Sequence, residues 1–73
     1  YEAYYYIGNS LNNLNNYDEA IKSFDKAIEI NPNYSVVYYH KGNSLNKLKR
    51  YKEAINFFDK AIEIFPTSQA YNY

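Results

Sequence analysis

The sequence repeats itself with a period of 34 residues, and this repeat restricts the chain to folds built from stacked, equivalent units. When each of residues 1–39 is compared with the residue 34 positions later, 21 of the 39 pairs are identical. A period of this length is typical of units that bury their apolar faces only against neighbouring units. The repeat therefore favours an extended, repetitive surface over a closed catalytic pocket.

Within each unit, apolar residues recur at the intervals of three and four that mark one face of a helix. In the first unit these faces are Tyr4, Ile7, Gly8, Leu11 and Leu14, then Tyr17, Ala20, Ile21, Phe24, Ala27 and Ile28. In the second they are Tyr38, Gly42, Leu45 and Leu48, then Tyr51, Ala54, Ile55, Phe58, Ala61 and Ile62. No segment sustains the alternation of a β-strand. We therefore predict an all-α fold of short antiparallel helix pairs.

Breaks between the predicted helices fall at equivalent places in the two units. Turn-prone Asn15-Asn16 separates the first two faces, and Lys49-Arg50 separates the last two. Pro32 and Pro66 end the units, because proline cannot continue a helix. Asn33 or Ser35 is expected to cap the next helix, and Thr67 or Ser68 a fifth one.

Small residues indicate where the paired helices cross. Gly8 with Ala20, and Gly42 with Ala54, remove side-chain bulk and allow close approach of the backbones. Glycine inside a helix costs about 0.5–1 kcal/mol relative to alanine, so its recurrence implies a steric reason. Phe24 and Phe58 are expected to fill the space beside each crossing, so the helices of a pair should pack closely at these points.

These residues closely resemble the tetratricopeptide repeat family, which has an aromatic residue and Gly in its first helix, Ala and an aromatic in its second, and Pro at the end. The matching residues are Tyr4, Gly8, Leu11, Tyr17, Ala20, Phe24, Ala27 and Pro32, with Tyr38, Gly42, Leu45, Tyr51, Ala54, Phe58, Ala61 and Pro66 in the second copy. The resemblance implies an α-α superhelix with repeats at 1–34 and 35–68 and the start of a third at 69–73.

The sequence departs from that family pattern at two places. Tyr4 and Tyr38 stand where the family usually has Trp. Lys41 replaces the apolar residue represented by Ile7. We expect the alkyl stem of Lys41 to lie along the core while its ammonium group stays in water.

The resemblance further implies a protein–protein interaction module that binds a peptide or partner helix in a concave groove, lined by the first helix of each repeat. By position, the groove residues are Glu2, Tyr5, Tyr6, Asn9, Asn12 and Asn13, then Val36, Tyr39, His40, Asn43, Asn46 and Lys47, then Ala70 and Tyr73. Tyr5 and Tyr39 are alternatively packing residues, although we favour exposure. The asparagines are alternatively plain solvated surface. We expect His40 to be an exposed groove residue.

Composition argues against several other classes of function. The chain has no cysteine and one histidine, so we expect neither a metal site nor a cofactor, and no set of residues is spaced for catalysis. No apolar run approaches a membrane span. We expect an intracellular, cytoplasmic location, and the absence of Met at position 1 suggests a piece of a longer polypeptide.

Charge is balanced overall but divided between the repeats. Residues 1–34 carry five acidic and two basic residues, a net −3, and residues 35–68 carry six basic and three acidic ones, a net +3. A neutral total makes a nucleic-acid partner less favoured, although an RNA-binding helical repeat stays open as an alternative. The opposite charges favour head-to-tail contact between molecules.

A third hypothesis is self-association through an open apolar end. Two repeats fall short of the roughly three that such folds usually need for stability. The last complete helix carries apolar residues that a further repeat would normally cover: Ile55, Phe58, Ile62 and Phe65. Copies of the chain are therefore predicted to stack end to end or to exchange elements.

Overall fold

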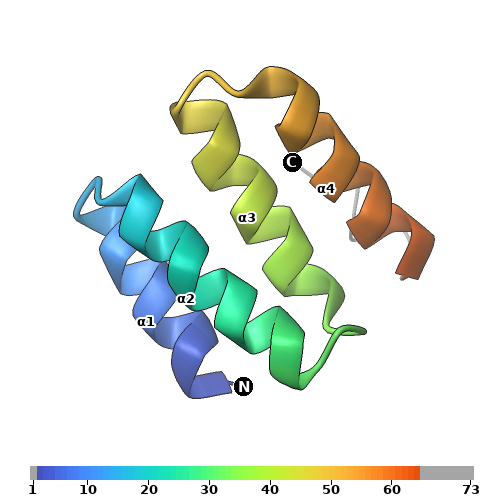
Figure 1. Ribbon diagram of the computed structural model, residues 1–73, viewed down its shortest axis with the longest axis horizontal. Coiled ribbons are helices and arrows are strands. Elements are labelled where there is room, and N and C mark those ends of the chain that lie inside the picture. The colour runs from blue at the N-terminus through green and yellow to red at the C-terminus, as the bar shows by residue number, and fades with distance from the viewer. Residues whose placement is uncertain (1, 65–73) are drawn as a thin grey trace.

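Four α-helices make up residues 2–64, the part of the chain that the computed structural model describes. They are α1 (Glu2–Asn13), α2 (Tyr17–Ile30), α3 (Ser35–Lys47) and α4 (Tyr51–Ile64). Each helix runs antiparallel to the next, and α3 lies between α2 and α4 (Figure 1). The predicted all-α fold of antiparallel pairs is confirmed. The expected fifth helix lies outside the described residues.

The two turns inside the repeats share one backbone design. Asn15 and Lys49 adopt positive φ angles of 65° and 64°. The backbone N–H of the next residue then donates to a carbonyl in the last turn of the helix, from Asn16 to Leu11 at 2.8 Å and from Arg50 to Leu45 at 2.9 Å. Left-handed residues commonly end helices in this way. Asparagine adopts a positive φ more readily than lysine does. The second turn therefore has the same backbone conformation as the first, although Lys49 is less suited to it than Asn15.

Both glycines lie where the helices of a pair cross, as the sequence predicts. A Cβ atom on Gly8 would lie 2.7 Å from Cδ1 of Phe24, and one on Gly42 would lie 2.7 Å from Cε1 of Phe58. Each phenylalanine ring therefore occupies the space that a side chain at the glycine would need. The recurrent Gly and Phe are a single packing device, used once in each repeat.

The two repeats join through α2 and α3. Val37 is fully buried in a core cluster with Phe24 and Ala27 of α2. The hydroxyl of Tyr38 donates to the carbonyl of Pro32 at 2.8 Å and so ties α3 to the end of the first repeat. The core of the molecule is thus centred on the junction between repeats.

Lys41 differs from its sequence-based expectation. Its ammonium group pairs with Asp25 of α2 and lies 4.2 Å from the centre of the Phe57 ring of α4. Only 14% of the Lys41 side chain is exposed. The expected wet ammonium is wrong because two neighbouring helices supply a carboxylate and an aromatic face.

The start of α3 also differs from its expected cap. Tyr34 precedes the helix, and no side chain accepts a hydrogen bond at its N-terminus. Asn33 instead donates its backbone N–H to the side chain of Asn31 at 3.3 Å. Ser35 is already the first helical residue. Neither proposed residue caps the helix, because Tyr34 occupies the cap position between them.

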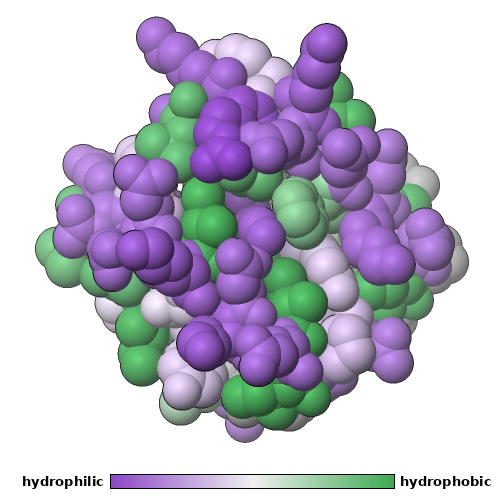
Figure 2. All heavy atoms as spheres, in the orientation of Figure 1, coloured by the Kyte–Doolittle hydropathy of each residue, from purple (hydrophilic) through white to green (hydrophobic). Residues whose placement is uncertain are grey.

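Exposed apolar side chains are concentrated on the outer helices. Tyr4 and Ile7 of α1, and Leu14 directly after it, were expected on a core face, but they are 39%, 49% and 71% exposed. Their counterparts Tyr38, Lys41 and Leu48 are buried or half-buried. Tyr38 and Lys41 contact Pro32 and Asp25 of the first repeat and also Phe57 of α4, whereas no described helix precedes α1. In the view of Figure 2, hydrophilic residues cover most of the surface, with apolar residues between them. None of the described helices is long and apolar enough to cross a membrane.

Candidate functional site

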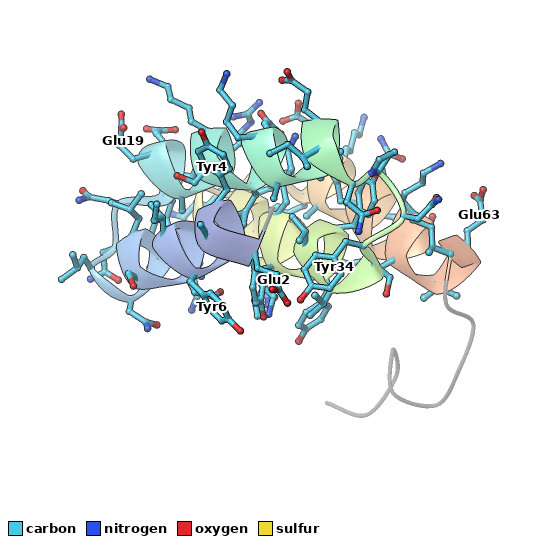
Figure 3. The ribbon with its side chains drawn as sticks, turned by 90° about the horizontal axis from the view of Figure 1, so that it is seen from below. Glu2, Tyr4, Tyr6, Glu19, Tyr34 and Glu63 are labelled. Atoms are coloured by element: carbon cyan, nitrogen blue, oxygen red, sulfur yellow. The ribbon has the colours of Figure 1, made fainter. Side chains whose placement is uncertain are left out.

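The first helices of the two repeats present a surface of tyrosine and asparagine side chains, which we name the Tyr/Asn face. All its residues are exposed or half-buried: Tyr5, Tyr6, Asn9, Asn12 and Asn13 of α1, and Tyr39, His40, Asn43, Asn46 and Lys47 of α3. Figure 3 shows Glu2, Tyr6 and Tyr34 projecting on one side of the molecule, opposite Glu19 of α2. The predicted groove residues of α1 and α3 therefore remain at least partly accessible to a partner.

An aromatic cluster occupies the N-terminal part of this face. The ring of Tyr5 lies 5.3 Å from those of Tyr6 and His40, and 5.6 Å from that of Tyr34. The Tyr5 hydroxyl and Nε2 of His40 are 3.1 Å apart, within hydrogen-bond distance. This bond joins α1 to α3 directly. The cluster therefore positions the face of the first repeat against that of the second.

His40 is half-buried, contrary to the expectation of an exposed groove residue. Its ring stacks on Phe24 with centroids 6.2 Å apart, because α3 packs across the end of the first helix pair. Burial lowers the pKa of His40 below its usual value. The neutral imidazole is consequently the form that the folded chain favours.

Tyr5 and Tyr39 serve partly as packing residues. Tyr5 lies 6.4 Å from the Phe24 ring, and Tyr39 lies 5.7 Å from the Phe58 ring, both measured between centroids. Both tyrosines are half-buried, so each keeps an accessible edge. The two interpretations left open by the sequence thus apply together, since each ring packs on a phenylalanine and each residue remains partly exposed.

Asn12 also has a structural role. It accepts a hydrogen bond from the fully buried hydroxyl of Ser44 at 2.8 Å, which links α1 to α3. Sequence reasoning missed this pair. Its signal is the recurrence of Ser two positions after each glycine, at Ser10 and Ser44. Asn12 is therefore less available to a ligand than its neighbours on the face.

The remaining predicted residues divide by accessibility. Tyr6, Asn13, Asn46 and Lys47 are exposed, and the equivalent pair Asn9 and Asn43 is half-buried. Val36 packs partly against the core cluster. Ala70 and Tyr73 lie outside the described residues. The accessible polar groups of the face are thus mainly side-chain amides, which both donate and accept hydrogen bonds.

The predicted self-association surface is only partly open. Ile55 is 56% exposed, while Phe58 and Ile62 are half-buried, because Phe58 packs on Gly42 within its own repeat. Phe65 lies outside the described residues. The opposite end of the molecule carries exposed apolar residues that sequence reasoning assigned to the core.

Other chemistry is sparse in the part of the chain that the structure describes. No three His, Cys, Asp or Glu side chains gather there in a way that would hold a metal ion. The basic residues around the α3–α4 turn are exposed, and Arg50 pairs with Glu53, whose hydrogen bond raises the pKa of Arg50. Surface pairs of this kind contribute little to stability.

Acidification is expected to destabilise the chain through His40. The unfolded chain takes up a proton at an ordinary histidine pKa of about 6.5, whereas the folded state resists it. Stability from this group is therefore present above that pKa and is lost as the pH falls below it. Urea midpoints measured between about pH 7.5 and 5.5 should decline in the parent chain, and this decline should shrink in His40→Gln. Equal declines would contradict the role of His40.

Comparison with known proteins gives one clear result. The family model described as tetratricopeptide repeat matches residues 1–34 and again residues 35–68. No curated protein sequence matches the chain significantly.

Proposed function

Because the chain belongs to the tetratricopeptide repeat family, whose repeats are generally non-enzymatic protein–protein interaction modules, we propose that it binds a peptide on the Tyr/Asn face. The peptide lies across α1 and α3, in an extended or helical conformation. The partner is a protein segment whose sequence the face does not identify.

One observation carries this proposal: the same tyrosine and asparagine side chains recur at equivalent, partly accessible positions of both repeats. Asn9 and Asn43 are half-buried at equivalent positions, as are Tyr5 and Tyr39. Each asparagine amide offers a donor and an acceptor, the combination that recognises a peptide backbone. Two equivalent amides 34 residues apart supply two such contacts.

The aromatic residues supply the apolar part of the interaction. Tyrosine presents a rigid ring with a polar tip and loses little conformational entropy on binding. Tyr5 is already held by its contacts to Phe24, Tyr34 and His40. A ligand therefore meets a preorganised ring, which lowers the cost of association.

The face also sets the chemistry of the preferred peptide. Its residues are neutral except for Lys47, and Glu2 lies next to the face at the start of α1. Uncharged side chains that stack on tyrosine or bond to amides fit this surface best. The binding should therefore depend only weakly on salt.

Selection from a random peptide library displayed on phage tests this proposal. Peptides enriched on the 73-residue chain should bind the Asn9→Ala/Asn43→Ala double variant about tenfold more weakly, which corresponds to losing about 1.4 kcal/mol of hydrogen bonding. Fluorescence anisotropy of the labelled peptides measures this change. Asn56→Ala provides the matched control, since Asn56 is an exposed asparagine of α4.

Two outcomes would place the function elsewhere. Equal binding to the double variant and to the parent chain would remove the Tyr/Asn face from the interaction. Tight, salt-sensitive binding of single-stranded RNA, with no peptide enriched, would favour the nucleic-acid alternative.

A further inference from the structure

The junction between the two repeats is a template for a contact between two molecules. At this junction α3 packs on α2, with Val37 against Phe24 and Ala27. The ion pair of Lys41 with Asp25 and the hydrogen bond of Ser44 with Asn12 complete it. All these positions have counterparts 34 residues away, on the outer helices α1 and α4 except for Asn46 of α3, the counterpart of Asn12.

The counterparts are exposed where the junction residues are buried. Tyr38 is 6% exposed in the junction, whereas Tyr4 at the same position of α1 is 39% exposed. Likewise, Phe24 is fully buried under α3, whereas Phe58 of α4 is only half-buried. Phe24 and Phe58 thus differ in burial with the presence of a neighbouring repeat, whereas Tyr38 is also covered within its own repeat by Phe57, where the first repeat has Ser23.

We propose that a second copy of this chain places its α1 on α4 of the first, in the register in which α3 packs on α2. The inference does not rest on the peptide-binding proposal, because it is argued from the packing of α3 on α2, although Asn46 of the Tyr/Asn face supplies one of its polar contacts. It goes beyond non-specific association of apolar ends, because it specifies which residues of the two copies are in contact.

The register preserves a polar contact of the internal junction. Ser10 takes the place of Ser44, and Asn46 takes the place of Asn12, so the Ser10 hydroxyl of one copy meets the Asn46 amide of the next. Ser10 and Asn46 are both exposed in the single chain. Each contact between copies also brings a repeat of net charge +3 beside one of net charge −3, as the internal junction does.

The register also contains two defects relative to the internal junction. Ile7 stands at the position of Lys41, so Asp59, the counterpart of Asp25, meets an apolar side chain instead of a cation. Ala3 stands at the position of the buried Val37 and leaves the space beside Phe58 and Ala61 less filled. The contact between copies is therefore weaker than the one inside the chain.

This arrangement is head to tail and leaves a free end on every assembly. Heterologous contacts of this kind build open filaments unless the rotation closes a ring. The average mass of the parent chain should therefore rise steadily with concentration in sedimentation equilibrium, without levelling at a dimer. The rise should lessen with added salt, because opposite charges meet at each contact.

The Asp59 position gives a test specific to the register. In an Ile7→Lys background, Asp59→Asn should weaken association about threefold, because it removes an ion pair. With the native Ile7, the same Asp59→Asn change should strengthen association, because it removes a carboxylate without a cationic partner. Sedimentation equilibrium on the four chains measures both effects, and this reversal of sign is the expected result.

The Ala3 position gives a second, independent test. Ala3→Val restores the side chain found in the internal junction and should strengthen association about tenfold, from two more buried carbons. Asn56→Val is the matched control, since its counterpart Lys22 stays exposed beside the internal junction. This control should leave association unchanged.

Three results would overturn the proposal. Monomers at every concentration would mean that another occupant, such as residues 65–73 of the same chain, holds the face of α4. A closed dimer would indicate an isologous contact between like faces. An equal effect of Asp59→Asn in both backgrounds would show contact without the proposed register.

Discussion

A Gly8→Leu variant is expected to be largely unfolded at room temperature. The Cβ atom alone would overlap the Phe24 ring, and leucine adds three more carbons at the same point. Phe24 has no exposed side toward which to move, because it is fully buried among residues of α1, α2 and α3. Overpacking usually costs about 1–3 kcal/mol per site and more where nothing yields, whereas a domain of this size has only about 4 kcal/mol of stability.

The alanine variants at the two glycines give a graded control. Gly8→Ala should destabilise the chain by about 1–2 kcal/mol, because the clash outweighs the better helix propensity of alanine. Gly42→Ala should be nearly neutral, because the half-buried Phe58 ring has room to move outward. Circular dichroism during urea titration measures both changes. Full helicity and an unchanged midpoint in Gly8→Leu would contradict the crossing geometry.

Phe24→Ala is expected to have the second large effect. The Phe24 ring is fully buried and packs with Ala27, Val37 and Tyr5. Removing a buried phenylalanine ring costs about 3–5 kcal/mol, from lost burial and the cavity left behind. This equals most of the stability of the chain, so the variant should melt at a much lower temperature or remain unfolded.

Phe58→Ala is the matched comparison in the second repeat. Phe58 makes the same contact with its glycine, but no described helix covers its outer side. Its loss should therefore cost clearly less than the loss of Phe24. Calorimetric melting at low chain concentration, where association is least, separates the two. Equal costs would mean that the outer side of Phe58 is covered as fully as that of Phe24.

Much of the fold could be predicted from the sequence because the repeat supplies each signal twice. The glycine and phenylalanine positions, the turns at Asn15 and Lys49, and the antiparallel pairing all agree with the structure. The environment of Lys41 could not be predicted. Its carboxylate partner lies 16 residues away on another helix, and its aromatic partner on a third. Periodicity identifies the face of a residue but not the side chains opposite it.

The candidate site was predictable only as a set of positions. Helical spacing correctly places Tyr6, Asn13 and Asn46 at the surface. It does not reveal that His40 packs on Phe24, or that Asn12 bonds to Ser44. Both contacts depend on the angle at which α3 crosses α1 and α2. The sequence carries no direct signal of that angle, since it arises from packing between repeats.

The equivalence of the α2 and α4 surfaces has a consequence for how such a chain evolves. The last helix of each repeat presents nearly the same surface to the repeat that follows it. A gene encoding such a chain can therefore gain or lose whole 34-residue units without disturbing the packing of those that remain. An insertion of one or two residues within a helix would instead turn the residues beyond it off the core face and displace glycine from phenylalanine. Duplication therefore comes first, and substitutions such as Ile7 against Lys41 then distinguish one unit from the other.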